Sequence, residues 1–282
     1  MTVLDNPARV TPAALNIGIR HARGAVIIIL GARAVVAPDF IAESIAALVR
    51  TGADAVGGVV ESRPWLGHDT ATARAIALAL RSPFGVGDAR YRYAGREQDA
   101  DTVNYGAYRR DVFDRIGLFD ESLSWVEDDE LNYRLRAAGG RLVVSPRIRV
   151  TYYARPSLGA LWRQQFHWGR YKPLVALRWP AQMRPRHAAP TVFVTALVVA
   201  ALASLVLRPA RALLAAVIGA YAVACAVAVA GAARTGDRAA LLRLPAAFTT
   251  MHVAYGTGMA LGLARTTPAL LRRLLTRDRG RR

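Results

Sequence analysis

Cysteine and lysine are almost absent from this sequence of 282 residues. The single cysteine, Cys225, excludes an internal disulfide, and because it lies in an apolar run we expect it to be a small core residue. Lys172 is the only lysine, so arginine carries nearly all of the net charge of +18. The sequence contains no zinc-ligand spacing and no nucleic-acid-binding motif, which favours an anionic membrane surface over nucleic acid as the partner of that charge.

Long apolar runs, in contrast, are plentiful after residue 188, and hydrophobic residues make up 53% of the whole chain. The ranges 188–207, 212–233 and 244–264 contain no Asp, Glu, Lys or Arg. Each has about 20 residues, which is long enough to cross about 30 Å of hydrocarbon. These runs predict transmembrane helices within 188–264, followed by a basic tail over 265–282.

The third apolar run has two features that leave its role open. His252 and Tyr255 lie inside it, where a polar group either has a function or makes a hydrogen bond between helices. Three spans would also place the arginine-rich tail outside if the preceding domain is inside, against the positive-inside rule. Either the third run is re-entrant, or the tail lies on a surface.

The first half of the chain alternates helical and strand-like segments, which predicts an α/β fold. Helices are expected over 11–24, over 40–50 with Asp39 as the cap, and over 70–80. The β-branched run 25–30 predicts a buried central strand of a parallel sheet, and 55–61 predicts another strand. A glycine-rich loop is expected over 82–95. Ligands of such sheets bind beyond the carboxyl ends of strands, where the loop Gly31-Ala32-Arg33 is expected.

Four adjacent carboxylates, Glu127 to Glu130, stand where another helix should begin. An apolar stripe follows at Leu131, Leu135 and Ala138, and two glycines end the segment. Acidic residues are common in a first turn because free N–H groups favour negative charge there, so an ordinary helix start is one interpretation. The other is a general base, because mutual repulsion should raise the pKa of one carboxyl.

The order of the motifs around this helix resembles the C-terminal half of a family-2 glycosyltransferase domain. Gly106-Ala107-Tyr108-Arg109-Arg110 and Gly117-Leu118-Phe119-Asp120-Glu121 precede the Glu127-Asp128 pair, and Gln164-Gln165-Phe166-His167-Trp168 follows it. The last segment is similar to a "QxxRW" motif with His167 at the arginine position. The resemblance covers roughly residues 6–265 and is nearest to membrane-bound transferases of the succinoglycan-biosynthesis type.

The resemblance implies an incomplete GT-A (nucleotide-diphospho-sugar transferase) domain over 1–155 and a site for a nucleotide-sugar donor and a membrane-linked acceptor. It makes Asp128 the base that deprotonates the acceptor hydroxyl, with Glu127 and Asp129 holding or tuning it. Acceptor or donor contacts are expected from Asn104, Gly106, Arg109, Arg110, Gln164, His167 and Trp168. The last three lie on an amphipathic segment, 156–187, which is expected to run along the membrane surface among its lipids.

The sequence departs from the family at two places. Related domains hold Mg²⁺ or Mn²⁺ with a "DxD" or "DxH" motif after the strand, whereas this chain has Gly31, Ala32 and Arg33, so no metal ligand is expected there. The "SIIIP" and "DDGSxD" strands that open the family pattern have no counterpart before Asn6-Pro7. The chain is then a fragment, the product of a misplaced start, or a degenerate paralogue.

The expected function is sugar transfer in polysaccharide or glycolipid synthesis, by a multi-pass protein of a bacterial-type cell membrane with its catalytic domain in the cytoplasm. The alternative is a non-catalytic membrane scaffold that pairs with an active transferase.

Overall fold

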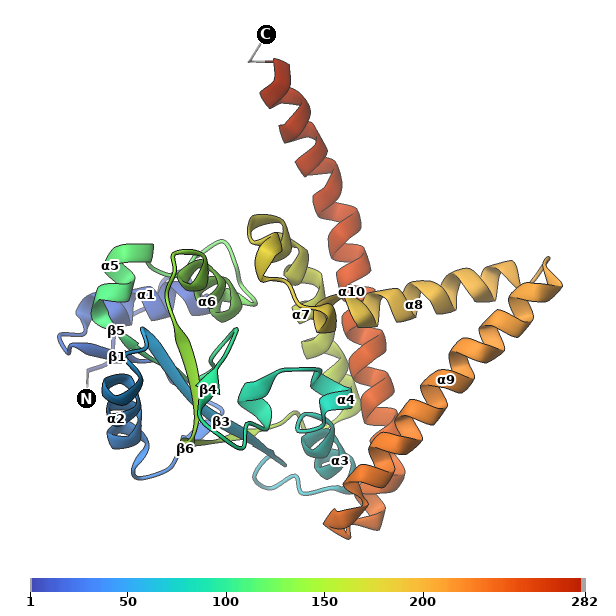
Figure 1. The fold of residues 1–282 in the computed structure, drawn as a ribbon, viewed down its shortest axis with the longest axis horizontal. Coiled ribbons are helices and arrows are strands. Elements are labelled where there is room, and N and C mark those ends of the chain that lie inside the picture. Colours follow the sequence, from blue (N-terminus) through green and yellow to red (C-terminus); the bar gives the residue numbers. More distant parts are fainter. Residues whose placement is uncertain (1, 280–282) are drawn as a thin grey trace. The chain divides into compact units, whose positions relative to one another are not determined.

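The computed structural model describes residues 2–279, and its chain forms two compact units. The first unit comprises residues 1–69 and 80–154, and the second comprises 70–79 and 155–282. Figure 1 shows the order of the elements, with strands confined to the first unit and long helices forming the second.

The first unit is built on a mixed sheet in the order β1-β5-β3-β6-β2, with β4 paired to β6. β3 and β6 run parallel over their whole shared length, whereas every other pairing is antiparallel. A mixed α/β sheet followed by helices confirms the predicted fold class. The strands are β1 (Val26–Ile28), β2 (Ala34–Val36), β3 (Ala55–Arg63), β4 (Gln98–Asp99), β5 (Ala107–Arg109) and β6 (Leu142–Tyr153).

The prediction that 25–30 forms a buried central strand is wrong in the described part of the chain. β1 has only three residues, stands at the end of the sheet, and pairs only with β5, antiparallel. Ile27 is buried, but Leu30 is 47% exposed. A β-branched run is typical of a central strand with both faces buried. Among the described residues, however, β1 has a hydrogen-bonded neighbour along only one of its edges.

Helices accompany this sheet (Figure 1), and α1, α2, α5 and α6 pack against it or join its core. Their extents agree with the sequence prediction to within a few residues, although the loop over 82–95 contains two short helical turns. Asp39 stands at the start of the second helix but makes no capping hydrogen bond, because its carboxylate faces Arg149 at 3.6 Å. The helices are α1 (Thr11–His21), α2 (Phe40–Thr51), α4 (Pro83–Val86), η1 (Arg90–Arg92), α5 (Arg110–Ile116) and α6 (Glu127–Ala137).

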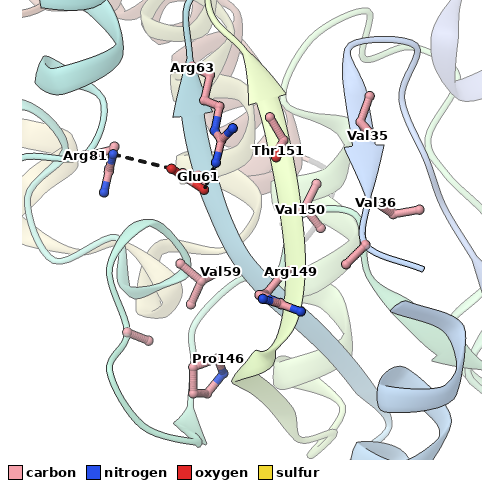
Figure 2. Close-up of a pocket in the computed structure, with 12 residues that line it drawn as sticks. Val35, Val36, Val59, Glu61, Arg63, Arg81, Pro146, Arg149, Val150 and Thr151 are labelled. Atoms are coloured by element: carbon pink, nitrogen blue, oxygen red, sulfur yellow. Dashed lines mark hydrogen bonds and ion pairs between the residues drawn. The ribbon is translucent and has the colours of Figure 1, made fainter. Parts of the chain in front are cut away.

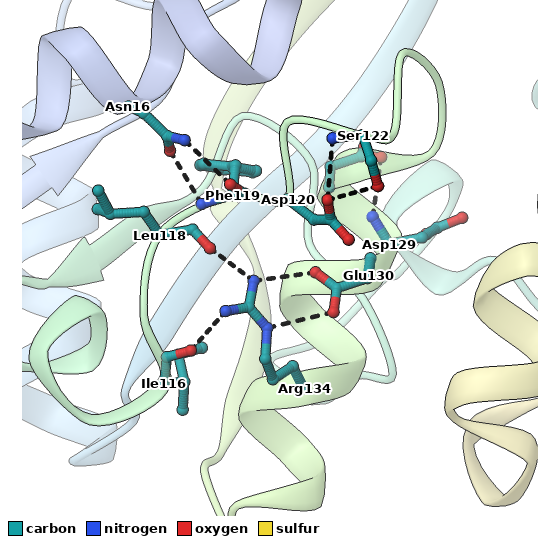
Figure 3. A network of polar contacts seen from close by, with 10 residues as sticks. Asn16, Ile116, Leu118, Phe119, Asp120, Ser122, Asp129, Glu130 and Arg134 are labelled. Atoms are coloured by element: carbon teal, nitrogen blue, oxygen red, sulfur yellow. Dashed lines mark hydrogen bonds and ion pairs between the residues drawn. The ribbon is translucent and has the colours of Figure 1, made fainter.

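A polar network ties α6 to the loop before it, as Figure 3 shows. Arg134 pairs with the buried carboxylate of Glu130 at 2.9 Å and donates to the carbonyls of Ile116 and Leu118. Asn16 of α1 exchanges two hydrogen bonds with the backbone of Phe119, both at 2.9 Å. The position of α6 is therefore fixed by charged and amide groups as well as by its apolar face.

The second unit consists of helices around α10. α10 packs against α7, α3 and α8. α7 and α10 approach closely at glycines: a Cβ on Gly258 would lie 2.2 Å from the carbonyl oxygen of Phe166. The elements are α3 (Ala71–Ala79), α7 (Leu158–Arg178), η2 (Pro180–Gln182), α8 (Pro185–Ala203), α9 (Arg208–Ala232), η3 (Ala233–Thr235) and α10 (Arg238–Arg279).

Two stretches in this unit, Pro185–Ala203 and Arg208–Thr235, are helical, long and apolar enough to span a membrane. They expose large apolar side chains such as Val192, 65%, and Val227, 68%. The third predicted run lies within α10, where the ring of His252 is 2.9 Å from the hydroxyl of Tyr221 on α9. A hydrogen bond between helices therefore accounts for this histidine. The predicted basic tail falls partly outside the described residues.

Candidate functional site

The loop Gly31-Ala32-Arg33 leaves the carboxyl end of β1, as predicted. A hydrogen bond from the Ala34 amide to the Gly31 carbonyl, 3.0 Å, closes it into a turn, and Ile29 bonds to Gly106 at 3.0 Å. The ring of Tyr105 lies against Gly31, since a Cβ on that glycine would be 3.2 Å from the tyrosine Cε1. Tyr105 itself has a φ of 53°, a left-handed conformation that is uncommon outside glycine. This strained tyrosine therefore stands directly over the loop.

Tyr105 links the loop to the acidic helix. Burial raises the pKa of its hydroxyl, the neighbouring Tyr152 and Asp128 raise it further, and Arg92 opposes them. The hydroxyl is thus within electrostatic reach of all three side chains and stays protonated near neutral pH. It can donate a hydrogen bond to a bound oxygen.

The first turn of α6 presents the acidic cluster. It follows Val126, whose φ of 60° turns the chain sharply into the helix. The Asp128 carboxylate accepts a hydrogen bond from the Asp129 amide at 2.9 Å, and Asp129 accepts one from Thr102 at 3.3 Å. Free N–H groups at a helix start stabilise such negative charge.

One turn further on, α6 is anchored to the segment before β5 by Asn132. Its fully buried amide donates to Thr102 at 2.8 Å and to the Val103 carbonyl at 2.9 Å, and it accepts from Tyr108 at 2.8 Å. These bonds hold the helix start beside residues 102–105. Asp128 and Tyr105 therefore belong to one rigid constellation.

The protonation of Glu127 is affected by its surroundings. Burial raises its pKa first, the charge of Asp129 raises it further, and a hydrogen bond to its own backbone opposes them. The predicted raised pKa in the acidic cluster is therefore present at Glu127, and its main cause is burial rather than the predicted repulsion.

A divalent cation does not fit the Gly31–Arg33 loop. Magnesium and manganese need hard oxygen ligands, and the side chains at positions 31 to 33 provide a hydrogen, a methyl group and a guanidinium. Arg33 is instead stacked on Trp65, with 5.5 Å between the guanidinium carbon and the ring centroid. Within residues 2–279 no group of three or more His, Cys, Asp or Glu side chains is arranged to hold a metal ion.

Asn104 and Gly106 flank Tyr105 and so lie at this site. Glycine is required at 106 by the protein's own packing, because a Cβ there would be 2.9 Å from the Tyr108 ring. The predicted approach to a sugar is therefore not needed to explain Gly106.

Arg109 and Arg110 lie at the opposite end of β1. Arg109 is paired across the sheet with Val26 and bound to Asp111 at 3.1 Å. Arg110 donates to the carbonyls of Gly24 and Ala22, both at 2.6 Å. Both guanidinium groups therefore hold the amino end of the strand, and the structure does not bring them to the Gly31–Arg33 loop.

Gln164, His167 and Trp168 lie on α7 in the second unit, so their predicted contact with substrate stays a prediction. Gln164 is buried, and so is Lys172 with 2% exposure. Because its side chain is enclosed, Lys172 adds no exposed charge to the segment 156–187.

A separate hollow of about 580 Å³ lies along β2, β3 and β6 of the first unit (Figure 2). Its Glu61 pairs with Arg63 at 3.1 Å and Arg81 at 3.7 Å, and its Arg149 pairs with Asp39. Each of these side chains is at least 40% exposed. Such exposed ion pairs are typical of a protein surface and contribute little to the stability of the fold.

The sequence prediction did not select Tyr105 or two of the side chains that act electrostatically on its hydroxyl in the candidate site, Arg92 and Tyr152. Tyr105 sits inside a motif from which only its neighbours were selected. Arg92 belongs to the run Arg90-Tyr91-Arg92-Tyr93 in the glycine-rich loop, and this concentration of arginine and tyrosine is a signal that the sequence does carry. Tyr152 has no such signal, because only the pairing of β6 brings it to the site.

Comparisons with known proteins agree on a family. The model of the glycosyltransferase-like family 2 matches residues 2–170. The succinoglycan biosynthesis protein ExoA of Rhizobium meliloti (strain 1021) is 32% identical over 197 residues, which are 67% of this chain and 58% of that protein.

A second relative is the dolichyl N-acetyl-alpha-D-glucosaminyl phosphate 3-beta-D-2,3-diacetamido-2,3-dideoxy-beta-D-glucuronosyltransferase of Methanococcus voltae. It is 27% identical over 179 residues, 61% of this chain and 54% of that protein. The chain thus spans a little more than half the length of the two curated relatives.

Among solved structures, the crystal structure of GalNAc-T7 with UDP, GalNAc and Mn²⁺ is 20% identical and has a TM-score of 0.37. It covers 62% of this chain and 38% of that chain, and the likeness is too low to support an argument about the site. The family match covers the first unit together with α3 and the first part of α7, which is more than half of the chain. The protein belongs to the glycosyltransferase-like family 2, with a GT-A-like mixed α/β domain followed by C-terminal helices.

Proposed function

We propose that this chain transfers a sugar from a nucleotide-diphosphate donor to a membrane-linked acceptor in polysaccharide or glycolipid synthesis. The observation that carries the proposal is the position of Tyr105, whose ring lies against the Gly31–Arg33 loop and whose hydroxyl is within electrostatic reach of Asp128. One curated relative is a succinoglycan biosynthesis protein, and the other is a transferase that acts on a dolichyl-linked phosphate.

Asp128 acts as the general base in this proposal. Its carboxylate removes the proton from an acceptor hydroxyl, and the oxygen then attacks the anomeric carbon as the bond from that carbon to the diphosphate breaks. The configuration at the carbon is inverted by this direct displacement. The Asp129 amide orients the carboxylate, and Asp129 is itself held by Thr102.

Tyr105 supplies a hydrogen-bond donor to the same reaction. Its raised pKa keeps the hydroxyl protonated, so it can stabilise negative charge that develops on a substrate oxygen. Glu127, with its own pKa raised by burial, limits the negative charge that gathers beside Asp128. The nearby carboxylates can then differ in protonation, as a base next to an acid requires.

Membrane attachment is the second part of the proposal. Two helical stretches are long and apolar enough to span, and within the structure only 11% and 6% of their most apolar windows are buried. Core helices of a soluble protein would be covered, so an unpartnered apolar surface of this size favours insertion into lipid. The proposed localisation is a multi-pass cell-membrane protein with the catalytic domain in the cytoplasm.

Membranes from cells that express the chain test the proposed function. They should move radiolabel from at least one member of a panel of nucleotide-diphosphate sugars into material extracted by organic solvent. Membranes carrying Asp111→Asn, a change in an exposed carboxylate of α5, should do the same, because that side chain lies with Arg109 away from the site. Lack of transfer by the unaltered chain with every donor would favour the alternative, a non-catalytic scaffold.

That alternative has one specific observation in its favour, the loop without carboxylates at 31–33. A scaffold would still sediment with membranes and would restore transfer only when a second, active transferase is supplied. Co-expression with and without such a partner separates the two functions.

A further inference from the structure

Arg92 is a buried cation without an anionic partner among the described residues. The residue is only 7% exposed. Its guanidinium makes one hydrogen bond, from Nη1 to the Ser62 hydroxyl at 3.0 Å. Its Nε is buried and has no hydrogen-bond partner. Arginine stays charged at any physiological pH, and burying an unpaired charge is costly. The fold therefore maintains an unsatisfied positive charge at this position.

Two tyrosines hold this guanidinium in place. The Arg92 guanidinium carbon lies 5.1 Å from the ring centroid of Tyr91 and 5.4 Å from that of Tyr152. Stacking of this kind fixes the plane of the group and leaves its edge N–H donors for other partners. The hydrogen bond from Nη1 to the Ser62 hydroxyl fixes the orientation of the guanidinium within that plane. The arginine is thus pre-organised rather than free to fold back into solvent.

The sheet places this arginine beside the candidate site. Tyr152 of β6 pairs with Ala34 of β2 on one side and with Ser62 of β3 on the other. Ala34 closes the Gly31–Arg33 turn, and Arg92 on η1 contacts both Ser62 and Tyr152, so the loop and the stacked arginine are tied to adjoining strands. Arg92 also acts electrostatically on the Tyr105 hydroxyl, as Asp128 does.

We infer that Arg92 recognises a phosphoryl group of the substrate and supplies the positive charge that the loop cannot obtain from a metal ion. The inference rests on the proposed function, because it names a residue that binds the substrate of that reaction. A planar guanidinium presents parallel N–H donors that match phosphoryl oxygens, which suits it to this role better than an ammonium group. The phosphoryl group belongs either to the diphosphate of the donor or to the phosphate of a lipid-linked acceptor.

Titration calorimetry on the full chain in detergent, with a chelator present to remove divalent cations, tests the inference. The probes are inorganic pyrophosphate and uridine diphosphate for the donor, and farnesyl phosphate for a lipid-linked acceptor. The unaltered chain should bind at least one class of probe, and Arg92→Met should weaken that binding by about tenfold or more. Arg90→Met is the matched control and should bind like the unaltered chain, because Arg90 is exposed on the same turn and bonded to Gln98.

The outcomes separate the inference from the proposed function. Equal affinities for Arg92→Met and the unaltered chain would overturn the inference, and so would a lack of binding of every probe. Loss of pyrophosphate binding in Arg92→Met, in a chain that shows no sugar transfer, would keep the phosphoryl site and reject the transferase. If Arg92→Met does not fold, arginine modification by phenylglyoxal on the unaltered chain decides. Pyrophosphate should then slow modification of Arg92 but not of Arg90, and equal rates would contradict the inference.

Discussion

Removing the guanidinium of Arg134 should destabilise the first unit more than any surface change. Arg134→Met leaves the carboxylate of Glu130, whose side chain is 4% exposed, without its partner at 2.9 Å. It also removes the donors to the carbonyls of Ile116 and Leu118. Breaking a buried ion pair on one side costs about 3–5 kcal/mol, because the remaining charge is uncompensated.

The size of the thermal effect follows from this free energy. For a domain of this size about 1 kcal/mol shifts the unfolding midpoint by about 2–4 °C, so a fall of roughly 6–20 °C is expected. Replacing both partners, as Glu130→Met with Arg134→Met, should recover a large part of the loss, since no unpaired charge then remains. Differential scanning fluorimetry of the four proteins in detergent measures the cycle.

Two results would refute the reasoning on this pair. A midpoint within 2 °C of the unaltered chain for Arg134→Met would show that the carboxylate readily finds solvent. A double variant at least as unstable as the single one would show that the carbonyl contacts, rather than the unpaired charge, dominate.

Three further predictions concern other parts of the molecule. Because burial raises the folded-state pKa of Glu127 above its unfolded value, ionisation costs stability as pH rises through that interval. Glu127→Gln should therefore flatten the fall in unfolding midpoint as the pH rises above the ordinary pKa of a glutamate, and parallel curves would contradict this. Gly258→Leu should disrupt the packing of α7 on α10, because even a Cβ at this position would be 2.2 Å from a carbonyl oxygen. Gly219→Leu is the control and should leave the packing intact, because the space around Gly219 is open. Limited proteolysis compares the two variants. The chain should stay with membranes through carbonate washes, and release by salt alone would show that its arginines rather than inserted helices hold it.

The sequence was sufficient to predict most elements of the first unit because their apolar periodicity and the residues that begin and end them are local signals. The helix at Glu127–Ala137 follows from acids in the first turn, an apolar stripe and a glycine stop, all within one segment. The segment 25–30 was predicted to be a central strand because its apolar composition indicates burial. Its actual position at the end of the sheet depends on which other segments pair with it. No local signal contains that information.

The site was predicted in part for the same reason. Asp128 could be selected because its motif is contiguous and resembles that of a family. Tyr152 could not, since only the pairing of β6 with β2 and β3 brings it to this place, whereas Arg92 belongs to an arginine- and tyrosine-rich run that was not selected. Arg109 and Arg110 were selected as cations near a motif, but the pairing of β5 with β1 carries them to the far end of the strand.

The most direct test of the central claim is the turnover of Asp128→Asn in the membrane assay for sugar transfer. The substitution keeps the shape of the side chain and its place in the first turn of α6 but removes the basic carboxylate. Turnover should fall by at least about 10²-fold, with the unfolding midpoint unchanged and Asp111→Asn at the unaltered rate. Turnover within twofold of the unaltered chain would contradict the assignment of Asp128 as the base and would move that role to Glu127 or Asp129, or end it.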